Sequence, residues 1–266
     1  QHRAGVIDGA SLSADTDDLS RRLGWLLHID EPERLRGYRD AVAHPSRSLS
    51  ALDRGRLHML DAQLENRGIM RAAEDTARYL ADRPAIAREL DELREVLEDR
   101  DTVLDQTLPV AEWPLALHRH YTRREIVAAV GLVTPGEKLM TPQAGVLKVK
   151  DEKRELLFVT LDKSGRGFSP TTRYKDYAIS RDLFHWETQA AASVSRPSGK
   201  RYIESATNEW QFYLFVRTAP EERAFAFLGP VRYQSHQGDR PVAITWRLEA
   251  PMTAALYDRY ATLRPR

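Results

Sequence analysis

The chain has 266 residues, 42% of them hydrophobic, which is enough apolar material for one large or two ordinary domains. It contains no cysteine, so disulfides, thiolate metal sites and a cysteine nucleophile are excluded. No apolar run approaches the roughly 18 residues needed to span a bilayer, and we therefore expect a cytoplasmic protein without a membrane partner.

Charge is distributed unevenly along the chain. Residues 1–110 contain 16 Arg, no Lys and 22 acidic residues, whereas residues 111–266 contain 24 basic and 17 acidic residues. The net charges are −6 and +7, and four of the five Trp lie in the second part. We therefore predict a domain boundary near residues 101–112, with one domain at 1–110 and a second at 111–266. The second is the one whose charge suits a polyanion.

Residues 1–110 have the apolar spacing of helices. The first segment, "QHRAGVIDGASLSADTDD", has neither an initiator Met nor a signal-type core, which predicts a piece of a longer protein. Leucines at helical spacing predict helices at 17–29 and 50–64, and further helices are predicted at 68–83 and at 84–100, where Ile86, Leu90, Leu93 and Leu97 share one face. Pro84 suits a first helical turn. We interpret this part as a bundle of four or five helices with solvated charged faces and no catalytic constellation.

The spacing of apolar residues changes after residue 111, from mainly helical to mainly alternating. "TRREIVAAVGL" predicts a short helix, in which Thr122 and Glu125 form a capping box and Gly131 ends the helix. The following extended segments alternate apolar and polar residues: "GVLKVK", "ELLFVTLD", "DYAIS", "LFHWETQ", "KRYIES", "WQFYLFVRTA", "FAFLG", "VRYQSH" and "VAITWRLEA". A final helix is expected at 252–263. The fold prediction is α+β: an all-α bundle, then a mostly antiparallel sheet or barrel of seven to nine strands with flanking helices.

The stretch "LDKSGRGFSPTTRYKDYAIS" holds the densest group of candidate functional residues. Small hydroxyls, cations and exposed rings hold a phosphodiester backbone and stack on bases, and the glycines allow close approach. The candidate nucleic-acid-binding residues here are Lys163, Arg166, Ser169, Thr171, Thr172, Arg173, Tyr174, Lys175 and Tyr177. The alternative interpretation is a solvated charged loop with Tyr174 and Tyr177 packed beneath it.

"LFHWETQ" has the alternation of a strand with two different faces. Trp186 lies on one face, where it serves either as core or as a stacking platform for a base. The other face carries His185, Glu187 and Gln189. This polar row either reads base edges or lines a pocket, or it is a satisfied surface.

"VRYQSHQGDRP" brings further candidates to one hairpin end. Tyr233, His236 and Arg240 complete the predicted nucleic-acid-binding set. Asp239 lies close to His236 in sequence, as in an acid–base pair, but one hairpin loop is a weak signal. A structural role for these two side chains is the competing interpretation.

Motifs of common enzymes are absent from the sequence, including the P-loop, the dinucleotide fingerprint, GxSxG, HExxH and the EF-hand loop. His118 and His120 are spaced like a metal pair on a strand, but no third ligand accompanies them, so we expect no metal site. Asp162 with Lys163, plus Glu187, is the nearest approach to a metal-dependent nuclease, without its usual Glu-x-Lys pairing. We therefore assign no catalytic residue, and a nuclease remains the second alternative.

Three blocks carry a family resemblance: "LLFVTLDKSGRGFSPTTRYKDYAISRDLFHWETQ", "GKRYI" and "FLGPVRYQSHQGDRPVAITWRLE". They resemble the uncharacterised domain C-terminal to the motor in certain bacterial DEAD/DEAH-box superfamily-two helicases, which often carry an N-terminal phospholipase-D-like nuclease. The resemblance extends from about Trp113 to about Tyr257. The segment "RRLGWLLHIDEPERLRGYRDAV" is similar to the region that joins motor and terminal domain in such proteins.

The resemblance implies a role in restriction, antiphage defence or other DNA processing. ATP and Mg would belong to a motor that this sequence lacks, so we expect no cofactor here. The implied function is a DNA-recognition module that reads a modified base or backbone, with Tyr174, Tyr177, Trp186 and Tyr233 as candidate rings. The alternative is a protein–protein interaction or regulatory module that docks on the helicase motor, which the near-neutral total charge favours.

Overall fold

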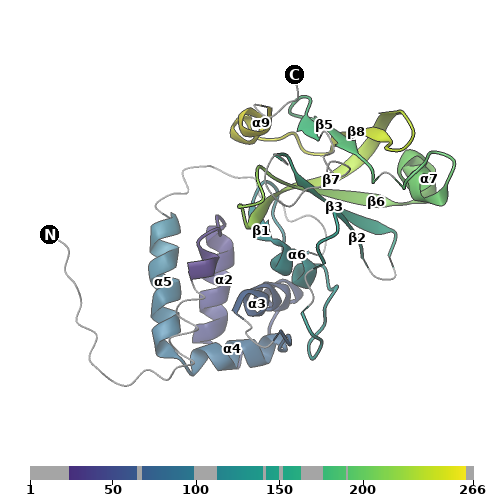
Figure 1. Ribbon diagram of the computed structural model, residues 1–266. Helices are drawn as coiled ribbons and strands as arrows, with labels where there is room; N and C mark the ends of the chain where they lie inside the picture. Colours follow the sequence, from purple (N-terminus) through teal and green to yellow (C-terminus); the bar gives the residue numbers. More distant parts are fainter. Residues whose placement is uncertain are drawn as a thin grey trace.

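The computed structural model describes residues 24–64, 68–98, 113–139, 142–149, 152–162, 176–189 and 191–261. Within these ranges a helical bundle packs beside a mostly antiparallel sheet (Figure 1). The predicted α+β class, with helices first and strands second, is confirmed. None of the helices in these ranges has the length and apolar character needed to cross a membrane.

The bundle follows a short 3-10 turn, η1 (Gly24–Leu26). Its helices are α2 (Pro32–Ala43), α3 (Ala51–Leu64), α4 (Ala73–Ala81) and α5 (Pro84–Glu98). Leucines whose spacing predicted these helices lie together in one core, among them Leu57, Leu60, Leu64 and Leu90. Most of the helix expected at 17–29 lies outside the described residues.

The described part of the second half contains one sheet of eight strands. They are β1 (His120–Thr122), β2 (Val146–Lys148), β3 (Arg154–Thr160), β4 (Tyr177–Ala178), β5 (Leu183–Glu187), β6 (Gln211–Arg217), β7 (Ala224–Gln237) and β8 (Ala243–Leu248). The strand order is β2-β3-β6-β7-β8-β5-β4, and β1 pairs with the first residues of β7. Only the β3–β6 pair among these is parallel. The order ends at β2 and β4, which do not pair in the described sheet, so it is open rather than a closed barrel.

The helices of the second half are α6 (Arg123–Ala129), α7 (Pro197–Ile203), α8 (Ser205–Asn208) and α9 (Ala254–Ala261). The capping box predicted for α6 is confirmed: Thr122 Oγ1 accepts from the Glu125 N–H, and Glu125 Oε2 accepts from the Thr122 N–H. Gly131 follows with a φ of +70°, the left-handed conformation that glycine adopts freely at a helix end.

Three predicted strand segments differ from the structure. "KRYIES" is largely α7 and not a strand, because Pro197 starts a helix there and the helical turn carries Tyr202 into the core. Gly199 allows this helix to approach the chain closely, since an added Cβ would overlap the Ser193 carbonyl. "FAFLG" and "VRYQSH" form one long strand, β7, which passes Gly229 with a φ of +86°.

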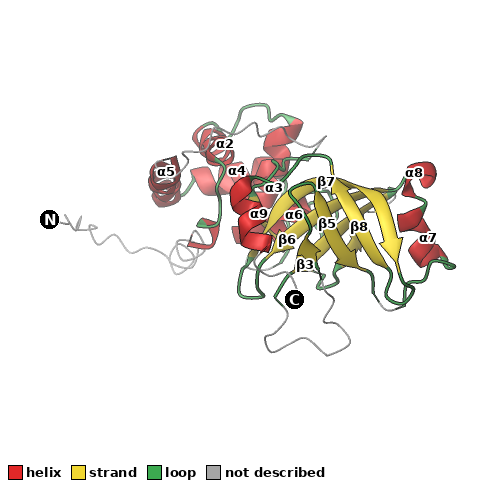
Figure 2. Cartoon of the chain, turned by 90° about the horizontal axis from the view of Figure 1, so that it is seen from above, coloured by secondary structure: helices red, strands yellow, loops and turns green. Residues whose placement is uncertain are grey.

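The sheet separates two apolar cores. On one face, residues such as Leu214 and Trp246 pack under Tyr202 of α7 and Tyr260 of α9. On the other face, Phe158 and Phe225 pack with α6 and with Met59 of the bundle helix α3. Figure 2 shows α7 and α8 at one end of the twisted strands. The bundle therefore contacts the second half of the chain through α3 and α6.

Candidate functional site

Most of the predicted nucleic-acid-binding residues cannot be placed in the structure. Lys163, Arg166, Ser169, Thr171, Thr172, Arg173, Tyr174 and Lys175 lie outside the described residues. The described members of the set are Tyr177, Trp186, Tyr233, His236 and Arg240. The structure distributes these five over two faces and one end of the sheet.

Tyr177 and Trp186 lie on opposite faces. The Tyr177 ring stacks on its cross-strand neighbour His185, with ring centroids 4.6 Å apart and an interplanar angle of 8°. Trp186 points the other way and is 5% exposed in the core, where its ring lies 5.2 Å from the ring of Tyr202. The partly exposed row His185 and Glu187 shares the Tyr177 face, as the alternation predicts.

The β7–β8 hairpin separates His236 from Asp239. His236 Nδ1 is hydrogen-bonded to the Tyr233 hydroxyl at 2.7 Å. Asp239 instead accepts hydrogen bonds from Ser193 Oγ at 3.1 Å and the Val194 N–H at 3.0 Å, and so ties the hairpin to the chain before α7. Arg240 is exposed and has a left-handed φ of 69°. His236 and Asp239 therefore have different hydrogen-bond partners and do not form an acid–base pair with each other.

Tyr233 also lines a groove of about 910 Å³. This groove lies where the first residues of β3 and β6 meet the second half of β7. Its lining consists of Leu117, Arg154, Ser205, Ala206, Glu209, Trp210, Gln211, Phe212, Tyr213, Pro230, Val231, Arg232, Tyr233, Glu249 and Ala250. The groove combines rings, cations and the side-chain amide of Gln211.

The rings and polar groups of the groove are held from several strands. Trp210 is half-buried, and the Lys148 ammonium lies 4.9 Å from its ring centroid. Gln211 Oε1 accepts hydrogen bonds from Arg154 Nε at 3.2 Å and from the Tyr213 hydroxyl at 3.0 Å. These contacts orient the groove's side chains before any ligand binds.

The groove's cations have carboxylate partners at the surface. Arg232 Nε lies 2.7 Å from Glu249 Oε1, with the two side chains 76% and 40% exposed. Arg154 Nη1 lies 3.0 Å from Glu152 Oε2. Exposed ion pairs contribute little to stability because water screens them and their side chains lose entropy. An incoming phosphate could therefore take the place of the Glu249 carboxylate on Arg232.

Sequence reasoning did not select Trp210, Arg154 or Arg232. Trp210 stands at the start of a predicted strand, and a large ring at such a position, next to the polar Glu209, was the available signal. No local sequence signal indicated Arg154 or Arg232, because these two residues meet at the groove only through the strand order β3-β6-β7.

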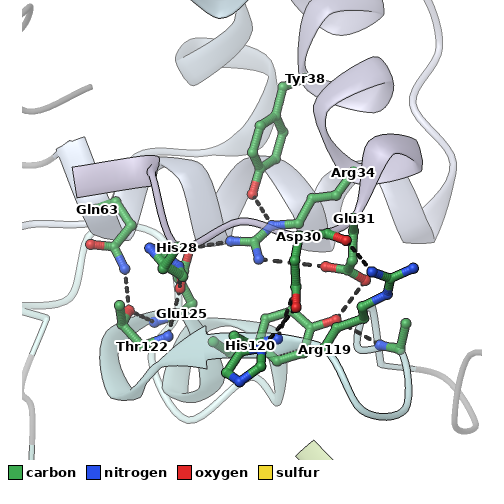
Figure 3. Close-up of polar contacts among 12 residues, drawn as sticks. His28, Asp30, Glu31, Arg34, Tyr38, Gln63, Arg119, His120, Thr122 and Glu125 are labelled. Carbon is green, nitrogen blue, oxygen red and sulfur yellow. Dashed lines mark hydrogen bonds and ion pairs between the residues drawn. The ribbon is translucent and has the colours of Figure 1, made fainter. Parts of the chain in front are cut away.

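A second polar cluster joins the bundle to β1 and α6 (Figure 3). We call it the interface cluster; it comprises His28, Asp30, Glu31, Arg34, Arg119, His120, Tyr121 and Glu125. At its centre Arg34 and Glu125, with side chains 1% and 0% exposed, form an ion pair and hydrogen bond. Burial acts to raise the pKa of Glu125, but Arg34, His28 and the Thr122 N–H together lower that pKa to about 2.

Glu31 and Tyr121 form the next part of the interface cluster. The Tyr121 hydroxyl donates to Glu31 Oε1 at 2.6 Å and accepts from the Ala116 N–H at 2.7 Å. The Arg34 guanidinium lies 5.1 Å from the Tyr121 ring centroid. Burial raises the pKa of Glu31 despite the nearby Arg34, and burial with the neighbouring Glu31 raises the pKa of Tyr121.

Asp30 binds the other side of β1. It accepts from the His120 N–H at 3.0 Å and lies 2.7 Å from His120 Nδ1, and its carbonyl accepts from Arg119. His120 thus has a carboxylate partner in the bundle half. Over the part of the chain that the structure describes, no group of three His, Asp or Glu is arranged to hold a metal ion.

Comparison with known protein families gives a match for the second half of the chain. A family described as a domain of unknown function, DUF3427, matches residues 115–260. The chain belongs to the DUF3427 family. No curated protein matches it. The DUF3427 match contains every groove-lining residue and the β1–α6 side of the interface cluster, whereas the bundle lies before it.

Proposed function

We infer that this DUF3427 protein is a DNA-recognition module that holds nucleotides in the groove. The observation that carries the inference is the convergence of Trp210 and Tyr233 with Arg154, Arg232 and Gln211 along one cavity. Rings stack on bases of any sequence, guanidinium groups bind phosphate oxygens, and a side-chain amide can pair with a base edge. The volume of about 910 Å³ falls within the range of ordinary ligand sites.

We further propose that the module serves a helicase-type protein of restriction, defence or other DNA processing. The blocks that resemble the terminal domain of such helicases lie within the DUF3427 match. In that setting the motor would hold ATP and Mg, and this chain would select the DNA. A modified base or backbone is the proposed target, because the half-buried rings Trp210 and Tyr233 can stack on a base that has left its duplex partner.

A second candidate function is docking of a peptide strand from the motor. The β6–β7 pairing stops at Val231, while β7 continues past the groove-lining Arg232 and Tyr233 to Gln237. A strand that outruns its neighbour can accept an extended peptide through main-chain hydrogen bonds. This candidate predicts retention of the motor without retention of DNA.

The test is a titration of the full chain with labelled single-stranded and duplex DNA at two salt concentrations. The panel comprises plain, methylated, hydroxymethylated, glucosylated and phosphorothioate DNA. We expect binding that weakens steeply with salt. Trp210→Ala should weaken it by roughly 5- to 150-fold, the effect of one lost stacking contact of about 1–3 kcal/mol.

Arg78→Gln is the matched control for cation loss, because Arg78 is exposed on α4 and pairs with Asp75 of the same helix. It should leave DNA affinity unchanged, whereas Arg232→Gln should lower it. A chain that retains no member of the panel at low salt, or a Trp210→Ala variant that binds as wild type, would reject the DNA proposal.

A further inference from the structure

The groove and the interface cluster share one short stretch of chain, residues 115–121. Leu117 lines the groove, and Tyr121 belongs to the interface cluster. The Ala116 N–H donates to the Tyr121 hydroxyl, which itself donates to Glu31. A single hydroxyl therefore connects the bundle to the backbone beside a groove-lining residue.

The groove wall at Leu117 is closely fitted to β7. The His118 N–H donates to the Phe227 carbonyl at 2.7 Å, and the Phe227 N–H donates to the Arg119 carbonyl at 2.9 Å. Gly229 lies against Leu117, where an added Cβ would overlap the leucine side chain. His118 has a φ of 64°, a conformation that surrounding contacts must hold in a non-glycine residue. The position of Leu117 thus depends on β7 on one side and on the Tyr121 hydroxyl, which binds the Ala116 N–H, on the other.

On the bundle side, the residues at the start of α2 that meet Tyr121 are held by several contacts. Glu31 is the N-cap residue of α2, and Arg34 lies in the first turn. Arg34 donates through Nε to the Tyr38 hydroxyl at 2.7 Å and pairs with Glu125. Buried polar groups with several partners have few alternative arrangements, because each lost contact leaves an unsatisfied group. The start of α2 therefore presents Glu31 to Tyr121 in a defined place.

We propose that the helical bundle is part of the binding unit, and that it positions Leu117, which lines the groove, through the chain Glu31–Tyr121–Ala116. Tyr121 is a positioning residue: it sets the wall without contacting the ligand. The bundle is then the cis partner that fits the β1–α6 surface of the DUF3427 domain. The effect on DNA rests on the proposed function, whereas the ordering of the wall does not.

The experiment is Tyr121→Phe in the full chain, which removes one hydroxyl and keeps the ring. Hydrogen exchange of the 115–118 amides is measured together with DNA affinity. We expect Ala116 to exchange about tenfold faster, the equivalent of one lost hydrogen bond, and DNA to bind several-fold more weakly. Glu31→Gln keeps an acceptor for Tyr121 and should restore slow exchange relative to Glu31→Ala.

Tyr38→Phe is the matched control. It removes a hydroxyl of the same buried surroundings that accepts from Arg34, whereas the Ala116 N–H donates to Tyr121. Exchange at 115–118 should stay at the wild-type rate in this variant. Equal acceleration in both variants, or no acceleration in Tyr121→Phe, would overturn the inference.

The two proposals fail separately. Absence of DNA binding by the wild-type chain rejects the proposed function, and the exchange rates still decide whether the bundle orders the wall. If Tyr121→Phe does not fold, the Glu31→Ala and Glu31→Gln pair supplies the same comparison, and identical exchange in both would reject the relay.

Discussion

The interface cluster and the groove use the same residue types in opposite surroundings. In the interface cluster, Arg34 and Glu125 are 1% and 0% exposed, whereas in the groove Arg232 and Glu249 are 76% and 40% exposed. A buried charge depends on its partner, because removal of one leaves the other without water or a counter-ion. An exposed charge is solvated either way and can exchange its partner. The charges of the interface cluster therefore have a structural role, whereas those of the groove are available to a ligand.

The largest expected effect is that of Arg34→Leu. It should lower the free energy of unfolding by about 3–5 kcal/mol, because Glu125 would remain buried without the Arg34 guanidinium that pairs with its Oε1. Chemical denaturation of the full chain measures this. Arg36→Leu, at an exposed arginine paired with Glu33 on the same helix, should change stability by no more than about 0.5 kcal/mol. Equal effects of the two variants would break the comparison.

The pH dependence of Glu125 should come next in size. Its folded pKa of about 2 lies below the ordinary value of 4.5, so its contribution is present above pH 4.5 and is lost as the pH falls toward 2. The contribution amounts to roughly 3 kcal/mol. The difference in unfolding free energy between wild type and Glu125→Gln should shrink across this window. A difference that stays constant from pH 6 to pH 2 would contradict the assignment.

Gly229→Ala should cost about 1–3 kcal/mol, since the residue has a φ of +86° and its new Cβ would overlap Leu117. DNA affinity should fall as well, because Leu117 forms the groove wall. Gly136→Ala is a suitable control: its φ is +87°, and an added Cβ meets nothing within 4 Å. Stability should then fall in both variants, but DNA affinity only in Gly229→Ala.

The smallest expected effect has the opposite sign. Glu249→Gln should leave stability within about 0.5 kcal/mol and strengthen DNA binding a few-fold at low salt, because Arg232 is released for phosphate. Binding titrations at two salt concentrations measure it. Loss of a carboxylate thus should destabilise the protein at Glu125 and improve ligand binding at Glu249. Weaker binding by Glu249→Gln would argue that this carboxylate is itself a ligand contact.

Local signals in the sequence predicted much of the fold. The capping box at Thr122 and Glu125 was predictable because its two partners are three residues apart, and both of its hydrogen bonds are present. The alternation in "LFHWETQ" placed Trp186 and His185 on opposite faces for the same reason. "KRYIES" was mistaken for a strand because its short pattern is compatible with both periods, and contact of Tyr202 with the core decides for the helix.

The candidate site was much less predictable. Tyr233 was selected from sequence, but Trp210, Arg154 and Arg232 join it through a strand order that places β6 between β3 and β7. The partner of Glu125 was equally hidden, since Arg34 lies 91 residues earlier. No periodicity within either segment indicates such a pair.

The amino-acid sequence by itself determined where helices and strands form, which of their faces are apolar, and that the second half is the basic, aromatic-rich part. These properties depend on neighbours within a few residues, through backbone geometry and the spacing of apolar side chains. The tertiary structure decided that Arg34 meets Glu125 in a buried interface while Arg232 stays exposed at the groove that Trp210 also lines. It did so because the strength of a charge interaction depends on burial, and burial is a property of the packed chain.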